Sequence, residues 1–417
     1  MNYFSTIILF FCICPFLIAQ NNGNDKFVAD GNVIVNTRDS SSFTNSHFRQ
    51  LDQTEVNLLF SYYEQEGDHA AVTGGTGSEE LHDLEFGIVV NIPLDSISTL
   101  NFDGGLTSYT SASNDRINFR VSSASRHEFR GRVEATYTRQ QLPKRTYYGL
   151  SAGFSGEVDY ISSTIGAKWG ITSIDNNRSF EVAGKYYFDI WVWLIYPEEL
   201  RFKKWADTKI RETYNLSFVY SQVLNPRLQT SLFAEGVYQT GLLSIPFHRV
   251  YFAENNEVRV ENLPKERFKL PLGIRLNYYL NDLFVLRTYY RYYRDSFDIE
   301  GHTASIEVPI QINPFLSFAP FYRYHYQTAS KYFAPFKTHE LDANYYSSDY
   351  DLSALSSHKV GFGIRYAPLY GVGRFKTPFA GGRKATLFEG VDFRAAYYRR
   401  SDGLSAFLLS LGLDFLM

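Results

Sequence analysis

Apolar and polar residues alternate with a period of two along most of this chain. In the C-terminal segment LSAFLLSLGLDFLM, every second residue from Phe407 to Phe415 is large and apolar, and Ser410 and Asp414 fall on the opposite face. The same division recurs in VNLLFSYY, LEFGIVVNI, TYYGLSAGFSGEV and KLPLGIRLNYY. Segments of about ten residues with one apolar face are typical of strands that cross an outer membrane. The pattern therefore predicts an all-β protein whose apolar strand faces contact lipid.

The connections between these segments alternate in length. Compact turn sequences occur at IPLDS, QLPKR, IDNNR, LNP, LND and INP. Longer polar loops are expected around residues 64–80, 111–125, 194–212, 241–267, 295–301 and 328–355. A tight outer turn near Asp159 and a long inner connection from Pro368 to Thr386 depart from the scheme. Together these features predict, over residues 51–417, a transmembrane antiparallel β-barrel of about 16 strands, with short periplasmic turns and long external loops.

Tyrosines support this scheme because membrane barrels carry aromatic girdles at both interfaces. A soluble β-sandwich is the alternative, and it would bury its large aliphatic residues and show no girdles. The outer band is predicted to hold Tyr62, Tyr109, Tyr238, Tyr290, Tyr292, Tyr324, Tyr326 and Tyr397, and the inner band Tyr137, Tyr148, Tyr220, Tyr278 and Tyr366.

The N-terminus predicts export. The apolar run from Ile7 to Ala19 is too short for a membrane-spanning helix and ends in a small residue, so we expect residues 1–19 to be a cleaved signal peptide. Both cysteines, Cys12 and Cys14, lie inside it. The polar residues 20–50 are expected to form a flexible periplasmic extension. The predicted location is the outer membrane of a Gram-negative bacterium.

Overall charge does not favour nucleic acid as a partner. The chain of 417 residues has a formal net charge of -3, whereas a nucleic-acid binder usually has a basic excess. The segment LRTYYRYYR could be mistaken for a basic aromatic patch. With a period of two, its arginines Arg287 and Arg291 face one side of a strand, and Tyr290 and Tyr292 face the other.

Several motifs resemble a family of Gram-negative outer-membrane proteins catalogued only as a domain of unknown function. These motifs are VNIPLDS, SSASRHE, LLSIPFHRVYF, RFKLPLGIRLNYYLND, VLRTYYRYY, SSDYDLSALSSHK and SDGLSAF. The resemblance extends from about residue 50 to the C-terminus and implies an outer-membrane barrel. It implies no catalytic residues. It also hints at a partner, because members are often encoded near a small lipoprotein and redox-related extracytoplasmic proteins.

Charged residues on the inward strand faces form the main candidate site. The basic side comprises Arg275, Arg287, Arg291, Arg323, Arg365 and Arg394, and the acidic side Glu85, Asp103, Glu134, Glu157, Glu181 and Glu235. Such a lumen could orient and select polar or anionic solutes. Alternatively, the charges pair across neighbouring strands and hold a packed interior. Arg132 and Lys185 on the acidic side, and Glu307 and Asp392 on the basic side, are exceptions to the division.

The external loops supply weaker candidates. Asp68, His69 and His82 could hold calcium or a transition metal, although their spacing matches no EF-hand. Asp349 and Asp351 could hold calcium or cap a turn. No metal site and no cofactor is predicted beyond these candidates. The apolar loop GLLSIPFHRVYF could fold into the lumen as a constriction containing His248 and Arg249, or it could pack on the rim.

The function that the sequence favours is a channel or transporter for small polar solutes, with anions as one class. A scaffold for a lipoprotein or a periplasmic redox complex is the alternative. A lipid-modifying enzyme has less support, because the chain lacks a G-x-S-x-G motif, and Ser356 with His358 is not a triad. We therefore expect a non-enzymatic protein whose partners are outer-membrane lipid and a small solute.

Overall fold

The computed structural model describes residues 53–110, 127–157, 159–194, 207–254, 257–376 and 385–417. The predicted signal peptide and N-terminal extension lie outside these residues. Among the residues described, no helix is long and apolar enough to cross a membrane.

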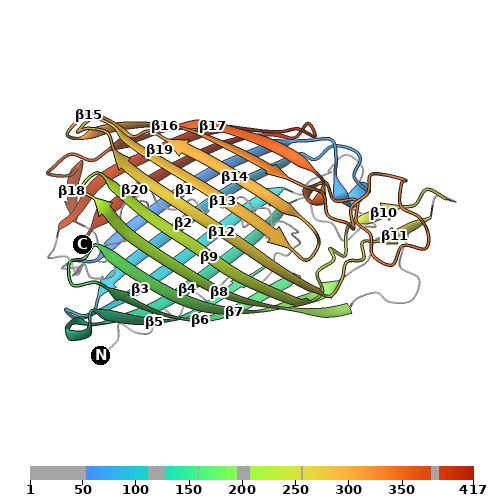
Figure 1. Ribbon diagram of the computed structural model, residues 1–417, viewed down its shortest axis with the longest axis horizontal. Helices are drawn as coiled ribbons and strands as arrows, with labels where there is room; N and C mark the ends of the chain where they lie inside the picture. The colour runs from blue at the N-terminus through green and yellow to red at the C-terminus, as the bar shows by residue number, and fades with distance from the viewer. Residues whose placement is uncertain (1–52, 111–126, 158, 195–206, 255–256, 377–384) are drawn as a thin grey trace.

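The chain forms one closed antiparallel barrel of sixteen strands (Figure 1). Each barrel strand pairs with the next in sequence, and β1 closes the sheet against β20, with Glu55 opposite Leu416 and Glu66 opposite Ser405. Closure leaves no unpaired strand edge in the membrane, which is why only closed sheets span a bilayer. The sixteen strands are β1 (Glu55–Glu66), β2 (Leu81–Pro93), β3 (Ser98–Thr110), β4 (His127–Gln141), β5 (Thr146–Gly156), β6 (Tyr160–Thr172), β7 (Arg178–Leu194), β8 (Asp207–Asn225), β9 (Leu228–Gly241), β12 (Glu266–Tyr279), β13 (Val285–Asp295), β14 (Glu300–Glu307), β16 (Leu316–Gln327), β17 (Leu355–Tyr366), β19 (Ala385–Arg400) and β20 (Ser405–Leu416).

Two short segments extend the sheet without adding barrel strands. β15 (Ile310–Asn313) continues the line of β14 after a break at Val308 and Pro309, and it pairs with β16. Proline has no backbone N–H and so cannot donate to the ladder, which explains the interruption. Among the described strands, β18 (Gly373–Lys376) pairs with β19, and it lies inside the long inner connection predicted from Pro368 to Thr386.

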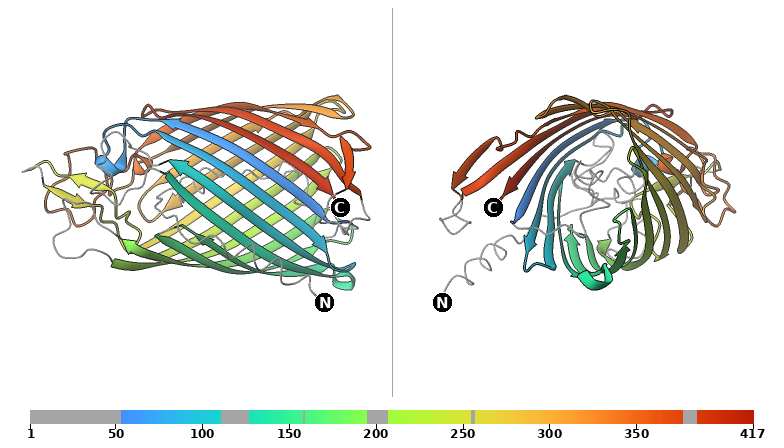
Figure 2. Two further views of the ribbon diagram at one scale, coloured as in Figure 1. Left: turned by 180° about the vertical axis from the view of Figure 1, so that it is seen from behind. Right: turned by 60° about the vertical axis from the view of Figure 1, so that its left-hand side comes forward.

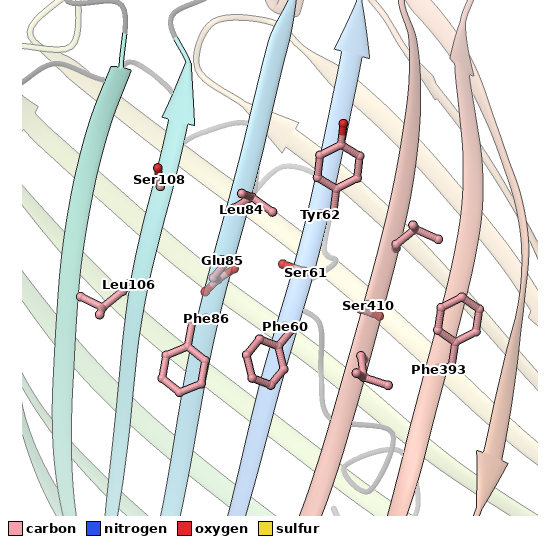
Figure 3. Close-up of a pocket in the computed structure, with 12 residues that line it drawn as sticks. Phe60, Ser61, Tyr62, Leu84, Glu85, Phe86, Leu106, Ser108, Phe393 and Ser410 are labelled. Carbon is pink, nitrogen blue, oxygen red and sulfur yellow. The ribbon is translucent and has the colours of Figure 1, made fainter.

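The outer surface of the barrel is apolar, as the alternation predicted. Large aliphatic side chains are exposed on it, among them Leu84 (58%), Leu106 (64%) and Ile165 (62%). So much exposed apolar surface is unfavourable in water and is matched by lipid. Figure 3 shows side chains of β1, β2, β3, β19 and β20 that line a shallow hollow on this surface. The volume of this hollow is about 430 Å³. The hollow therefore faces lipid and is not a solute site.

Three details of the sequence prediction were wrong. Tyr109 does not belong to the outer girdle, because it is 4% exposed and its hydroxyl donates to Glu157 Oε2 at 3.3 Å. The loop expected at residues 295–301 is a tight turn between Asp295 and Glu300. The loop expected at 194–212 is shorter, because β8 already begins at Asp207.

Both ends of the described barrel, at β1 and β20, lie at the end with the compact turns. The long connections gather at the opposite end, where the β10–β11 hairpin extends beyond the barrel strands (Figure 1). This hairpin, β10 (Arg249–Tyr251) with β11 (Val258–Val260), is a separate two-stranded sheet that the alternation did not reveal. Three 3₁₀ turns complete the described elements: η2 (Ala71–Thr73), η3 (Leu142–Lys144) and η5 (Tyr350–Leu352).

Candidate functional site

Ion pairs between strands that are not neighbours establish which strand faces form the inner wall. Arg394 on β19 pairs with Glu307 on β14, although β16 and β17 lie between them. Lys185 Nζ on β7 lies 2.7 Å from Glu134 Oε1 on β4, across β5 and β6. Adjacent strands are about 4.8 Å apart, so side chains this far apart in the sheet can meet only on its concave face. These charged residues therefore project inward.

Three of the six predicted basic residues form ion pairs with acidic residues. Glu307 forms ion pairs with two arginines, Arg287 and Arg394. Arg287 Nη1 lies 2.9 Å from Glu307 Oε1. Arg365 lies 3.0 Å from Asp414 Oδ2 and 3.8 Å from Asp392 Oδ2. The basic side is therefore a set of local ion pairs as much as a region of positive charge.

The other three predicted arginines have different surroundings. The guanidinium of Arg275 lies over the rings of Phe233 and Tyr289, at 5.3 and 5.7 Å from their centroids. Arg323 lies opposite Ser305 and Lys359 in the strand register. Arg291, on β13, makes no ion pair with any residue that the structure describes.

The predicted acidic residues are paired in the same way. Glu85 and Asp103 share Arg132, whose Nη2 lies 3.2 Å from Glu85 Oε1. Glu157 lies 3.5 Å from Arg130 Nε, and Glu134 receives Lys185. Glu181 accepts a hydrogen bond from the Tyr147 hydroxyl at 2.5 Å, whereas Glu235 has no ion partner in the described part of the chain.

The structure thus contains the ion pairing that the sequence allowed as the alternative to a charge-separated lumen. A close ion pair largely cancels its own field at a distance, so the unpaired charges contribute most to solute selection. Arg291 is a predicted basic residue with such an unpaired charge among the described residues.

Three external segments interlock at the outer end of the barrel; we call residues 67–80, 242–254 with 257–265, and 328–354 the outer loop cluster. Its core is Val250 and Phe252, both 0% exposed, packed with Tyr346. The Phe252 and Tyr346 rings meet edge to face with centroids 5.0 Å apart. His69 stacks on Tyr350 with centroids 3.7 Å apart. The buried aromatic contacts make these loops one packed unit.

Glycine allows the first segment to approach the hairpin closely. Gly74 has φ +81°, and a Cβ on it would lie 2.4 Å from the Tyr251 ring. Only glycine fits both that backbone region and that contact. This close approach explains the glycine at position 74.

The structure places the predicted constriction residues inside the outer loop cluster. His248 and Arg249 are 6% and 9% exposed. Arg249 Nη1 donates to the Val72 carbonyl at 2.7 Å, and His248 Nδ1 lies 3.6 Å from Glu261 Oε1. These contacts match the alternative in which the loop packs on the rim. A constricting role in the pore stays a prediction.

The weak metal candidates have separate surroundings. His69 Nδ1 lies 3.1 Å from the Gly75 carbonyl, and His82 Nδ1 lies 3.7 Å from Glu64 Oε1. Asp349 accepts a hydrogen bond from the Asp351 backbone N–H at 3.0 Å, which is the turn-capping role that the Asp-x-Asp pattern allowed. Asp68 lies in the loop between β1 and η2. No group of three or more ligating side chains forms a metal site within the described residues.

We expect His339 to make the outer loop cluster sensitive to acid. Burial lowers its pKa below the ordinary value of 6.5, because the packed loops disfavour the charged imidazolium. The folded cluster therefore binds fewer protons than the unfolded loops below pH 6.5, and its stability falls as the pH falls from there. We expect faster proteolysis of residues 328–354 at pH 5 than at pH 7.5. His339→Gln should reduce this difference, and an undiminished difference would assign the effect to other groups.

The sequence prediction missed two buried carboxylates that each accept several hydrogen bonds, Asp295 and Glu261. Asp295 was assigned to a loop, and Glu261 was not considered. Their signal was an acidic residue at a strand end followed by a turn, which is too common to single out.

Solved structures with similar chain paths are outer-membrane barrels of low sequence identity. The BenF-like porin from Pseudomonas fluorescens Pf-5 is 8% identical, with a TM-score of 0.40 over 88% of this chain and 100% of that one. A bacterial polysaccharide outer membrane secretin is 7% identical, with a TM-score of 0.47 over 88% and 99%. A mutant of the ferric enterobactin receptor from Pseudomonas aeruginosa is 12% identical, with a TM-score of 0.44 over 84% of this chain and 54% of that one. The chain thus spans about half the length of that receptor.

A search of curated proteins found no match. Residues 36–372 match the sequence model of the family described as "Protein of unknown function (DUF3570)". This range covers most of the barrel, from β1 to the connection before β18. The chain therefore belongs to the DUF3570 family, and its fold is an outer-membrane β-barrel.

Proposed function

We propose that this barrel is an outer-membrane channel or transporter for small polar solutes, with anions as one candidate class. The supporting observation is the charged inner wall, in which ion pairs such as Lys185–Glu134 bridge strands that are not neighbours. A barrel of about sixteen strands can enclose an aqueous lumen. Fixed charges on such a wall discriminate among solutes by sign and shape.

Transport is preferred to catalysis and to a scaffolding role on chemical grounds. Many charged side chains on the wall, such as Lys185, Arg287 and Arg365, are held by partners of opposite sign, and this arrangement fixes their position without activating a nucleophile. A scaffold would need a partner surface, and the core of the outer loop cluster, Val250, Phe252 and Tyr346, is packed within the cluster itself. Co-purification of a lipoprotein from native membranes in mild detergent, together with an electrically silent barrel, would favour the scaffold, and a lone stable monomer would count against it.

Conductance in a planar lipid bilayer tests the proposal directly. The refolded full-length protein is expected to give discrete conductance steps and to pass small anions at least as well as cations of similar size. Absence of any conductance from correctly folded protein would contradict the channel. A liposome-swelling assay with neutral and anionic sugars would then separate slow transport from a sealed lumen.

Arg291→Gln is expected to lower the anion-to-cation permeability ratio by about twofold to threefold. The reason is that this guanidinium has no acidic partner among the described residues, so its charge is not cancelled locally. The reversal potential in a salt gradient measures the ratio. Arg294→Gln is the matched control, since Arg294 is exposed on the opposite strand face and lies 3.5 Å from Glu300. Equal ratios in both variants and the parent would exclude Arg291 from selection.

A further inference from the structure

Two tyrosine–histidine groups with the same geometry lie on the outer surface of the barrel. In the first, His302 on β14 lies beside Tyr290 and Tyr292 of β13. Its Nδ1 is 2.7 Å from the Tyr290 hydroxyl. The centroid of the His302 ring lies 6.2 Å from that of Tyr290 and 5.4 Å from that of Tyr292, with interplanar angles of 35° and 53°.

The second group repeats the first on neighbouring strands. His358 on β17 lies beside Tyr322 and Tyr324 of β16, and its Nδ1 is 2.7 Å from the Tyr322 hydroxyl. The centroid distances are 6.1 and 5.2 Å, and the angles are 34° and 51°. Both tyrosine pairs belong to a Tyr-Arg-Tyr sequence whose arginine faces the other way. The repetition makes a chance arrangement of surface side chains a poor explanation.

Both groups lie on the outside of the barrel wall, near its outer end. His302 and His358 are exposed, and they share their strand faces with the exposed apolar residues Ile306 and Val360. His302 is close to the outer start of β14, and His358 is close to the outer start of β17. Figures 1 and 2 show that β13, β14, β16, β17 and β19 lie side by side in one part of the wall. The groups are therefore placed where lipid headgroups meet the barrel.

An arginine adds a fixed positive charge beside the second group. Arg399 on β19 is directly opposite His358 in the strand register and is exposed on the same face. It has no acidic partner among the described residues. An unpaired guanidinium at a membrane interface favours an anionic oxygen ligand, and phosphate matches its fork of donors.

The tyrosine hydroxyls also determine which nitrogen of each imidazole is the hydrogen-bond donor. A phenol hydroxyl is a good donor, so Tyr290 and Tyr322 donate to the Nδ1 atoms and leave each Nε2 to carry the hydrogen. The Nε2–H donors then point away from the hydroxyls. β14 and β17 are separated by β16, and His358 lies two residues along β17 from the position level with His302. The backbones of the two histidines are therefore about 12 Å apart. The surface thus offers two separated donors and a guanidinium.

We propose that His302, His358 and Arg399, with their four tyrosines, form a binding surface for phosphate groups of lipids in the outer leaflet. Charge complementarity and the position at the headgroup level select this ligand. The site is independent of solute transport, since these side chains lie outside the wall. The tyrosine rings contact the acyl boundary, and the imidazoles and guanidinium bind the phosphate oxygens.

Two other histidines on the described outer surface provide controls. His82 Nδ1 also lies 3.5 Å from the Tyr62 hydroxyl, but Glu64 stands opposite His82, where the first group has a second tyrosine. Glu64 Oε1 lies 3.7 Å from His82 Nδ1, so a carboxylate would oppose phosphate there. His127 Nε2 is 2.8 Å from Ser108 Oγ, so the nitrogen that would face phosphate is already engaged. The proposed surface is therefore restricted to the β13–β19 side of the barrel in the described structure.

Native mass spectrometry of the full-length barrel in detergent, titrated with purified bisphosphorylated lipid A, tests this proposal. The unmodified protein is expected to bind the lipid, and the same lipid after enzymatic removal of its phosphates should bind at least tenfold more weakly. His302→Phe, His358→Phe and Arg399→Gln combined should cause a similar loss, because phenylalanine keeps the ring packing and removes the donors. His82→Phe should bind like the parent.

Three outcomes would overturn the proposal: equal binding of phosphorylated and dephosphorylated lipid, unchanged binding by the triple variant, or no binding by the parent. A dimer of the parent that the triple variant loses would instead identify the surface as a contact between copies. If the triple variant does not fold, as judged by heat-modifiable gel migration, Arg399→Gln alone replaces it. That variant leaves both tyrosine–histidine groups intact and is expected to bind about threefold more weakly; parental affinity would contradict the proposal.

Discussion

Asp295→Ala is expected to lower the free energy of unfolding of the barrel by about 3–5 kcal/mol. The Asp295 side chain is fully buried at the turn between β13 and β14. Its Oδ2 accepts hydrogen bonds from Arg267 Nε at 2.9 Å and from the Tyr293 hydroxyl at 2.8 Å. Its Oδ1 accepts from the backbone N–H groups of Phe297 and Ile299, at 2.9 and 3.1 Å. Alanine would leave a guanidinium and two backbone donors buried without their acceptor.

Equilibrium unfolding in urea, with the protein refolded into phospholipid vesicles, measures this effect. Asp298→Asn is the matched control in the same turn, because asparagine tolerates the left-handed backbone at this position (φ +67°) and removes only the charge. Asp298 is 61% exposed and lies 3.0 Å from Lys331 Nζ, so its loss should cost about 0–1 kcal/mol. If the two variants differ by less than about 1 kcal/mol, the buried network does not stabilise the turn.

The barrel was predictable because its main determinant is local. Each strand must place apolar residues on alternate positions, so the direction of Arg287 and Arg291 follows from a short stretch of sequence. The turn sequences then fix most strand boundaries. The interruption at Pro309 was also local in origin, but the alternation continues across it and so conceals it.

The contacts of the inner wall were not predictable, because they depend on closure. Arg394 and Glu307 are 87 residues apart and meet only after the sheet curves and the register is set. Alternation correctly indicated that both face inward, and it carried no information on which charges pair. The division into a basic and an acidic side did not include Asp414, which pairs with Arg365.

The outer loops were the least predictable part for a related reason. The strands β10 and β11 are three residues long each, which is too short for alternation to appear. Their stability comes from burial of Val250 and Phe252 against a loop about ninety residues further along the chain. Sequence patterns report the period of an element and not the partners of a loop.

Glu261→Ala is expected to raise the initial rate of tryptic cleavage in the outer loop cluster by about a hundredfold, which corresponds to about 3 kcal/mol of local stability. The Glu261 side chain is 1% exposed. Its Oε2 accepts a hydrogen bond from the Ile245 backbone N–H at 2.6 Å, and its Oε1 accepts one from Ser347 Oγ at 2.5 Å. It therefore joins the second and third segments of the cluster, and alanine would leave buried donors on both.

Lys331 and Lys337 in the third segment provide cleavage sites, and fragments identified by mass spectrometry report which loop opens. Glu257→Ala is the control in the same hairpin, because Glu257 is 43% exposed and lies 2.7 Å from Arg259 Nε. The rate of tryptic cleavage of this variant should stay within about twofold of the parent rate. Unchanged cleavage in Glu261→Ala would mean that the aromatic core of Val250, Phe252 and Tyr346 holds the loops without this carboxylate. Faster cleavage with unchanged single-channel conductance would show that the outer loop cluster packs at the rim without limiting the passage of ions, whereas a conductance change in step with cleavage would make the cluster part of the solute path.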